Sequence, residues 1–559
     1  MKRNAISIVL NVHVPFVREP KIPDAAEERW FFESLSETYL PLLEMFDRLD
    51  ADHVPFRMAL SLSPILCHLC KDELLLERYL DYTDRQIEFG AGEIERTKGN
   101  EVLQHLAKRF YDTALERRIN FTERYEKNII GVFARYQRKG RLELLNTAAT
   151  HAFLPFYTSW PETIQAQFEV AVSSYRRCFG SREIRRTDAR SQGFWLPELG
   201  WTPELEGFFR AYNFGYTIVD THAFALSKPP APYGSFYPAR TPRGLLLLAR
   251  DYYAHKDIVD SERGFLHDGV YRDNYEDVGY ELPVDMIRPF TGATQARSAT
   301  GYKYRALGYS ASRKGGKPLY NPEKAAQKAR EQAITFLDRR IMQFNLAAKF
   351  MDQTKVSLCA YNADTFGRFW HEGTWFLEAL FREGAKRETI QFMTPSEYLF
   401  KQNIMDLEVI MPGFSSGGVN GYAETWLDAS NDWMYRHVTR SLERMIELAD
   451  RFPNESGIKE RLLNQAAREI LLVQTSDWAK MLYKKEAAGY ARTEIEMSLR
   501  NFTTIYEALA SNYISTEWFT TLERRHNVFP YINYRVFRHA LPSRGALIEA
   551  TLHQPLHGA

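Results

Sequence analysis

The chain has 559 residues, of which 45% are hydrophobic and 26% are charged, and its formal net charge is +1. These proportions are typical of a folded globular protein, and the length exceeds one ordinary domain. The charge balance gives no electrostatic case for binding nucleic acid or an anionic membrane surface. No apolar run in the sequence is long enough to cross a membrane as a helix.

Four cysteines are too few for a disulfide framework in a chain of this length. Cys67 and Cys70 have the spacing of a redox or zinc motif, but no second pair of cysteines or histidines follows at a zinc-finger spacing. Because residues 60–75 are largely apolar, the pattern favours two buried thiols on a helix. The apolar run behind the N-terminus is too short for a signal peptide, so we expect a cytoplasmic protein.

The first 150 residues are predicted to alternate between strands and helices. A continuous apolar run is typical of a buried strand, and apolar residues three or four apart indicate a helix. Residues 6–14 form such a strand, and its polar end carries Asn11 and His13. Further elements expected here are a helix within 25–50, a strand at 55–61, helices within 70–137 and a strand at 142–146.

The most distinctive stretch runs from Gly193 to Trp201 and contains Glu198 among tryptophan, proline and glycine residues. An unpaired charge is costly in an apolar setting, so a glutamate here implies a need for its carboxylate. The stretch could hold that carboxylate rigid beside a ring-shaped ligand. The alternative is a structural loop glutamate with aromatic neighbours, and the stretch alone does not decide between the two.

Two later strands are expected to end in polar residues. One covers 216–220 and ends at Asp220, and the other covers 356–361 and is followed by Asn362 and Asp364. Strands that alternate with helices and carry polar residues at their carboxyl ends are typical of a parallel α/β barrel or sheet.

The chain is expected to divide into a barrel domain at 1–410 and a helical C-terminal domain at 411–559. The barrel part contains a loop-rich insertion around 228–310, which begins with a proline-rich loop at 229–234. A proline-rich loop suits a mobile segment that borders a cleft. Helical periodicity dominates the C-terminal part, at 433–452, 459–478 and 490–511.

Several short motifs occur in a fixed order along nearly the whole chain. They are Asn11-Val12-His13-Val14-Pro15-Phe16, Gly140-Arg141-Leu142-Glu143-Leu144-Leu145, Thr150-His151, Trp195-Leu196-Pro197-Glu198, Val219-Asp220-Thr221-His222, Tyr361-Asn362-Ala363-Asp364-Thr365-Phe366-Gly367, Gly421-Tyr422, Trp426-Leu427, Asn431-Asp432-Trp433 and Ser476-Asp477-Trp478. Each motif alone is weak, but together and in this order they are specific. On them the chain resembles glycoside hydrolase family 57, and within it the α-1,4-glucan branching enzymes and their α-amylase-like relatives.

The resemblance implies an α/β fold, a (β/α)7 barrel followed by an all-helical domain that completes the cleft. It also implies a retaining mechanism, in which two carboxyl groups about 5–5.5 Å apart flank the glycosidic bond. One carboxylate attacks the anomeric carbon, and the other group protonates the leaving oxygen and then deprotonates the acceptor. Water as the acceptor gives hydrolysis, and a sugar 6-hydroxyl gives branching.

By the same resemblance, Glu198 is the expected nucleophile and an α-1,4-glucan is the expected substrate. No cofactor and no metal are implied, because the chemistry needs none. Residues expected to line the substrate cleft are His13, His151, Trp195, Asp220, Tyr233, Asp364, Trp426 and Asp477. Glu143, Trp433 and Trp478 are weaker candidates, for which a structural role is the alternative.

The sequence departs from the family at the position of the second catalytic group. The family's acid/base lies in a Tyr-Asp-Ala-Glu pattern, and this chain has Asn362 in place of the aspartate. An amide neither donates a proton as an acid nor accepts one as a base at neutral pH. Three readings follow: a glucan-binding member with lost or weakened turnover, which we favour; a takeover by Asp364; or an engineered replacement that traps substrate.

Two further departures lie elsewhere in the motifs. Asn11 stands where the family usually has the first histidine of a His-x-His pair, and an engineered trap would not need that change. Gly417 stands where branching enzymes tend to carry tryptophan, so a sugar-stacking ring worth about 1 kcal/mol is absent. The predicted function is therefore an α-glucan-active retaining enzyme of branching type with reduced turnover. The alternatives are an inactive glucan-binding or regulatory homologue, and a plain α-amylase or 4-α-glucanotransferase.

Overall fold

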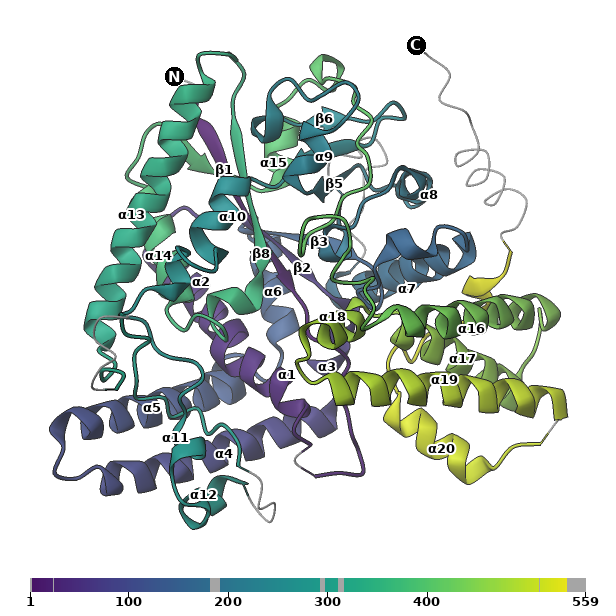
Figure 1. Cartoon of the computed structure of the whole chain (residues 1–559), viewed down its shortest axis with the longest axis horizontal. Coiled ribbons are helices and arrows are strands. Elements are labelled where there is room, and N and C mark those ends of the chain that lie inside the picture. Colours follow the sequence, from purple (N-terminus) through teal and green to yellow (C-terminus); the bar gives the residue numbers. More distant parts are fainter. Residues whose placement is uncertain are drawn as a thin grey trace.

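The computed structural model describes residues 3–23, 25–180, 192–291, 297–309, 316–511 and 513–539. At the centre of this part of the chain, parallel strands follow the order β7-β5-β4-β3-β2-β1-β8 in one curled sheet (Figure 1). The short strand β6 pairs antiparallel with β7, and β9 pairs with the start of β1. The strands are β1 (Asn4–Val12), β2 (Met58–Leu62), β3 (Leu142–Thr147), β4 (Gly193–Trp195), β5 (Tyr216–Val219), β6 (Ala239–Arg240), β7 (Leu246–Ala249), β8 (Val356–Asn362) and β9 (Ile390–Phe392).

Helices cover the outside of the sheet and continue beyond it. Those up to residue 400 are α1 (Glu28–Ser34), α2 (Leu40–Ala51), α3 (Pro64–Leu69), α4 (Glu73–Arg96), α5 (Glu101–Ile119), α6 (Ile129–Arg138), α7 (Pro161–Phe179), α8 (Glu206–Ala211), α9 (Thr221–Ala225), α10 (Tyr252–Val259), α11 (Val278–Glu281), α12 (Val284–Thr291), α13 (Pro322–Ala347), α14 (Gly373–Gly384) and α15 (Pro395–Phe400). Those past residue 430 are α16 (Asp432–Arg451), α17 (Gly457–Val473), α18 (Ser476–Lys484), α19 (Ala488–Ser511) and α20 (Thr516–Arg525). Among the described residues, none of these helices has the length and apolar character that a membrane crossing needs.

The architecture confirms the (β/α)7 barrel that the sequence predicts. The strands expected around residues 6–14, 142–146, 216–220 and 356–361 are present as β1, β3, β5 and β8. β1 is buried from Ala5 to Val12, as expected for a parallel strand covered on both faces. β2 begins at Met58, a few residues later than predicted, and Pro55 in the predicted part lacks the N–H that a strand ladder requires.

The segment at 250–310 differs in part from its prediction as a loop-rich insertion. It contains the short helices α10, α11 and α12, which are too short to leave a clear helical period in the sequence. Asp251 explains where α10 starts, because its carboxylate accepts from the backbone N–H groups of Tyr253 and Ala254, both at 3.0 Å. Asp251 also closes the barrel: its own N–H donates to Leu358 O in β8 at 2.8 Å, and its side chain accepts from Ser357 Oγ at 2.6 Å.

The C-terminal helices gather at one side of the barrel, and α18 lies between that group and the strands (Figure 1). The attachment is made by backbone hydrogen bonds. Ser476 N–H, at the start of α18, donates to His151 O at 3.1 Å. Trp201 and Ser415 exchange two backbone bonds of 2.8 and 3.1 Å. The first contact fixes the start of α18 against the loop that follows β3, and the second joins the segment after β4 to the chain that leads into the C-terminal helices.

Candidate active site

A cavity of about 680 Å³ opens where the carboxyl ends of β4 and β8 face α18. Parallel barrels carry their reactive groups at this end of the strands. Four of the residues predicted from the sequence line it, namely Trp195, Glu198, Asn362 and Trp426. Glu198 follows β4 by three residues, and Asn362 is the last residue of β8, so both strands deliver a polar side chain to the same space.

The backbone at Glu198 is held in a left-handed conformation, with φ 55° and ψ 20°, and Leu199 follows with φ 54°. Such conformations cost of order 1–3 kcal/mol for a residue with a side chain, and they concentrate at functional sites. Gly417 supports the turn, because its N–H donates to Glu198 O at 2.7 Å. A Cβ at Gly417 would approach that oxygen to 3.1 Å, a tight contact, so a larger residue here would require the turn to shift.

Two side chains of α18 contact the Glu198 carboxylate. Ser476 Oγ donates to its Oε1 at 3.3 Å, and the Lys480 Nζ lies 3.8 Å from the same oxygen. The Glu198 carboxylate raises the pKa of Lys480, although burial of the ammonium acts in the opposite direction. The carboxylate is therefore oriented by a hydroxyl and lies beside a cationic side chain.

A continuous run of hydrogen bonds connects Asn362 with Glu198. The Asn11 amide nitrogen lies 3.1 Å from Asn362 Oδ1 and 3.1 Å from His151 Nε2. His151 Nδ1 lies 3.0 Å from Ser476 Oγ, which in turn donates to Glu198. Five elements supply this network: β1, β8, the turn after β3, the turn after β4 and α18.

The donors and acceptors of this network are consistent with one protonation state. Burial, and then the charge of the neighbouring His13, hold the pKa of His151 well below its ordinary value, so the ring is neutral. Its Nε2 then accepts from Asn11, and its Nδ1–H donates to Ser476. Asn11 thus uses both of its N–H donors, one toward His151 and one toward the exposed Asn362.

His13 and Asp477 form a second pair beside the network. His13 Nε2 lies 2.7 Å from Asp477 Oδ2, and His13 Nδ1 lies 2.8 Å from Ser63 Oγ. Burial raises the pKa of Asp477, but His13 outweighs it and holds that pKa well below the ordinary value. The His13 ring stacks on His151 with 4.0 Å between centroids. The ring nitrogens and the Asp477 oxygen lie within 4.8 Å of one another, but each of these nitrogens already faces a protein hydrogen-bonding partner.

Three other predicted cleft residues belong neither to the lining of this cavity nor to these hydrogen-bonded groups. Asp220 caps α9 and forms an ion pair with Arg250, which does line the cavity. Asp364 accepts from Ser34 Oγ at 2.8 Å, which places its carboxylate against α1. Tyr233 contacts Tyr237 edge-on, and its hydroxyl accepts from Gln353 near the start of β8, at the opposite end of that strand from Asn362.

The weaker candidates take structural positions. Glu143 is buried and accepts from Tyr216 Oη at 2.6 Å and from Ser396 N–H at 3.0 Å. Trp478 is 3% exposed within the core. The Arg492 guanidinium covers the Trp433 ring at 4.6 Å.

Sequence reasoning did not single out several polar residues of the cleft. Lys480 and Ser476 accompany Asp477 on the first turn and a half of α18, so the helical spacing around a predicted site residue was the available signal. His255 and Arg250 also line the cavity. Burial, followed by the Arg250 charge, lowers the pKa of His255 to about 4. Both belong to the segment predicted as an insertion, where no motif marked them.

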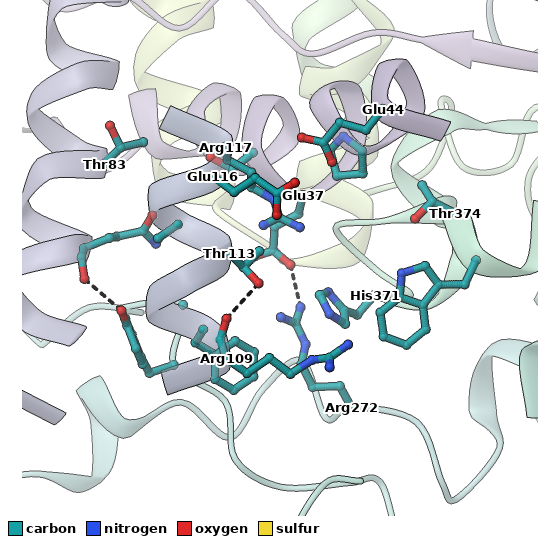
Figure 2. A pocket seen from close by; sticks show the side chains of 18 of the residues that line it. Glu37, Glu44, Thr83, Arg109, Thr113, Glu116, Arg117, Arg272, His371 and Thr374 are labelled. Carbon is teal, nitrogen blue, oxygen red and sulfur yellow. Dashed lines mark hydrogen bonds and ion pairs between the residues drawn. The ribbon is translucent and has the colours of Figure 1, made fainter. Parts of the chain in front are cut away.

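A second polar cavity, of about 200 Å³, lies between α4, α5 and the loop around Arg272 (Figure 2). Arg272 donates to the Glu37 carboxylate in a largely buried ion pair, and its backbone N–H donates to Glu372 at 3.0 Å. This pair attaches the segment at 250–310 to the π-helical turn at Leu35–Tyr39. None of the cleft residues predicted from the sequence lines this cavity.

Comparison with known proteins gives the family. The model of glycosyl hydrolase family 57 matches residues 7–408, and that of the C-terminal part of 1,4-alpha-glucan branching enzymes matches residues 437–537. The chain belongs to glycosyl hydrolase family 57. In this family 57 protein, the first model covers the barrel. The second covers the helices that bring Ser476, Asp477 and Lys480 to the cleft.

Relatives of this family 57 protein match it over almost its whole length. The solved structure of the alpha-amylase AmyC from Thermotoga maritima is 31% identical, covers 97% of this chain and all of that one, and superposes with a TM-score of 0.88. A 1,4-alpha-glucan branching enzyme of Thermococcus kodakarensis is 24% identical over 94% of this chain and 78% of its own length. The branching-enzyme structure from Pyrococcus horikoshii shares the fold, with a TM-score of 0.84 at 22% identity over 96% of this chain and 97% of that one.

Proposed function

We propose that this protein binds α-1,4-glucans in the cleft between the barrel, at 1–410, and the helical part, at 411–559. In this proposal it is a retaining α-glucan enzyme of branching type whose proton-transfer steps are disabled at Asn362. Glu198 is the nucleophile that attacks the anomeric carbon. The observation that carries the proposal is the hydrogen-bonded run from Asn362 through Asn11, His151 and Ser476 to Glu198.

The run supports the proposal because it keeps an oriented carboxylate at one end and has an amide, Asn362, at the other. The Glu198 carboxylate is held in place by two side chains of α18, and a nucleophile needs such a fixed position. Asn362 is exposed at the end of β8, where an acid/base group would meet the glycosidic oxygen. Its amide carries no proton to give and has no basic lone pair at neutral pH. General acid/base help contributes roughly 10²–10⁴-fold, so this chain should turn over unactivated glucans slower by about that factor.

A second candidate function is a glucan-binding or regulatory protein with no turnover. The presence of Asn11 favours it, because its amide is paired with Asn362 and the cleft departs from the family at two adjoining positions. Both functions require glucan affinity, so turnover separates them. The third possibility, a plain α-amylase or 4-α-glucanotransferase, differs in the acceptor.

The test is incubation of the purified protein with amylose, followed by iodine absorbance and by reducing ends. A slow loss of iodine absorbance without a matching rise in reducing ends supports transfer of branching type, and a matching rise indicates hydrolysis. Amylose binding without either change supports the binding protein. Rapid branching, at the rate of a family enzyme with aspartate at this position, would refute the assignment of Asn362 as the disabled group. Glu198→Gln is the control, and it should abolish any turnover while amylose binding persists.

A further inference from the structure

Two cysteines from distant parts of the barrel meet at the junction with the C-terminal helices. Cys67 lies on α3, and Cys178 lies in the last turn of α7. Both side chains line the same cavity, and each thiol shifts the pKa of the other. Cys67 is 3% exposed, whereas Cys178 is only partly buried. Cys67 therefore shares this cavity with Cys178, a cysteine that the spacing of Cys67 and Cys70 did not indicate.

Cationic groups surround the accessible thiol. Lys71 Nζ lies 3.4 Å from Cys178 Sγ. Cys178 lines a cavity of about 670 Å³ together with Lys71, Arg18 and Arg177. The acidic residues of this cavity are Asp72, which is paired with Arg18 at 2.7 Å, and Glu73. The positive charge next to the sulfur is thus that of Lys71.

These contacts favour the thiolate form of Cys178. The neighbouring Cys67 thiol lowers the pKa of Cys178 to about 6, with help from Lys71 and against the effect of burial. The free carbonyl groups at the C-terminal end of α7 disfavour a negative charge on Cys178. The pKa of Cys178 is nevertheless lowered, because the effects of the Lys71 ammonium and the Cys67 thiol are larger. The charge belongs on Cys178 rather than Cys67, because Lys71 contacts Cys178 and Cys67 is the more buried sulfur. Cationic, partly exposed surroundings of this kind are typical of reactive cysteines.

We propose that Cys178 is a reactive thiolate that soft electrophiles and hydroperoxides modify, and that Cys67 is its resolving thiol. The Cys178 thiolate attacks the distal oxygen of a hydroperoxide, the O–O bond breaks, and alkoxide leaves and takes up a proton. Cys178 is oxidised to the sulfenic acid, and the peroxide is reduced to an alcohol, or to water for hydrogen peroxide. Cys67 then attacks the sulfenic sulfur, an S–S bond forms and water leaves.

Alkylation tests the nucleophile. The intact protein is treated with iodoacetamide between pH 5 and 9, and each cysteine is quantified by peptide mapping. Cys178 should react first with a midpoint near 6, and Lys71→Met should slow its alkylation at pH 6 by about tenfold for each pH unit by which the midpoint rises. Cys359 is an internal reference, because it is fully buried in β8 and stays unmodified. Reaction of Cys178 no faster than Cys359, or a midpoint above 8, would overturn the proposal.

Oxidation tests the resolving thiol. After treatment with one equivalent of hydrogen peroxide, non-reducing peptide mapping should find a Cys67–Cys178 disulfide. In Cys67→Ser the sulfenic acid on Cys178 should persist and be captured by dimedone, and in Cys178→Ser neither product should form. Cys70→Ala is the matched control and should retain the disulfide. A Cys67–Cys70 disulfide, or no oxidation of the wild-type protein, contradicts the assignment, and the wild-type result decides even where a variant folds poorly.

Discussion

The Asn11 side chain donates a hydrogen bond of 3.1 Å to Asn362, directly opposite it in the parallel β1–β8 pair. From the sequence motifs, both residues are predicted to stand where the chain departs from the family pattern. The two departures are therefore one structural unit, in which a neutral amide donates to a neutral amide. A replacement engineered at 362 alone would leave the family's histidine at position 11, so the pair favours natural divergence of this cleft.

In the proposed mechanism, Asn362→Asp should supply the acid/base group. Asn11 can donate to a carboxylate oxygen as well as to an amide oxygen, so the network accommodates the change. We expect amylose turnover to rise by roughly 10²–10⁴-fold, measured by iodine absorbance and reducing ends. Asp364→Asn, introduced into the Asn362→Asp background, is the matched control. Because the Asp364 carboxylate faces Ser34, this change should leave the regained activity largely in place. Activity that stays flat in Asn362→Asp would show that the cleft is defective elsewhere too.

Asn11→Ala should weaken the regained activity in the Asn362→Asp background. It removes the donor from both the introduced carboxylate and His151, and an acceptor left unpaired in a buried site costs about 1–3 kcal/mol. We expect a fall of about tenfold in turnover, together with a lower melting temperature. Asn4→Ala is the control, since Asn4 bonds Lys355 N–H at the opposite end of β1. It should reduce stability without a selective loss of turnover, and equal losses in the two variants would contradict a role for Asn11 in the site.

Lys480→Met should reduce turnover in the Asn362→Asp background by about tenfold, which corresponds to about 1.4 kcal/mol in the activation barrier. The ammonium lies 3.8 Å from Glu198 Oε1 and is the partner charge of that carboxylate. The value of KM should change less than kcat, because the effect acts through the nucleophile. Lys484→Met lies one turn later on α18 and also lines the cavity, so it should affect KM at most. If Lys480→Met raised KM and left kcat unchanged, Lys480 would have no role in the chemical step.

His255→Gln should change how stability depends on pH. The folded protein holds the pKa of His255 at about 4, below the ordinary value of 6.5, so between these values the unfolded chain binds more protons. The free energy of unfolding then falls as pH falls through this window. Removal of His255 should flatten that slope by up to about 1.4 kcal/mol per pH unit, measured by urea denaturation. His105→Gln, at an exposed position, should leave the slope unchanged.

Particular residues show how far the sequence could lead. Glu198 was identifiable because a carboxylate within an apolar, aromatic stretch needs a reason, and β1 and β8 were identifiable as continuous apolar runs. The contact between Asn11 and Asn362 was not, because it depends on which strands pair and in which register, across 351 positions of chain. Ser476 and Lys480 reach Glu198 from a helix almost as far away. Tyr233 was expected at the cleft on its proline-rich loop, but packing against Tyr237 directs it elsewhere.

The most direct test of the account is covalent trapping with α-maltosyl fluoride. Fluoride leaves without a proton, so an intact nucleophile forms the glycosyl-enzyme even when the acid/base is absent, and the intermediate accumulates because no base activates water. Mass spectrometry of the unaltered protein should show one maltosyl group on the peptide that carries Glu198, with release by azide, which needs no base, and no adduct in Glu198→Gln. An unmodified protein, or an adduct on another residue, would contradict the assignment of Glu198 as a working nucleophile opposite a disabled Asn362.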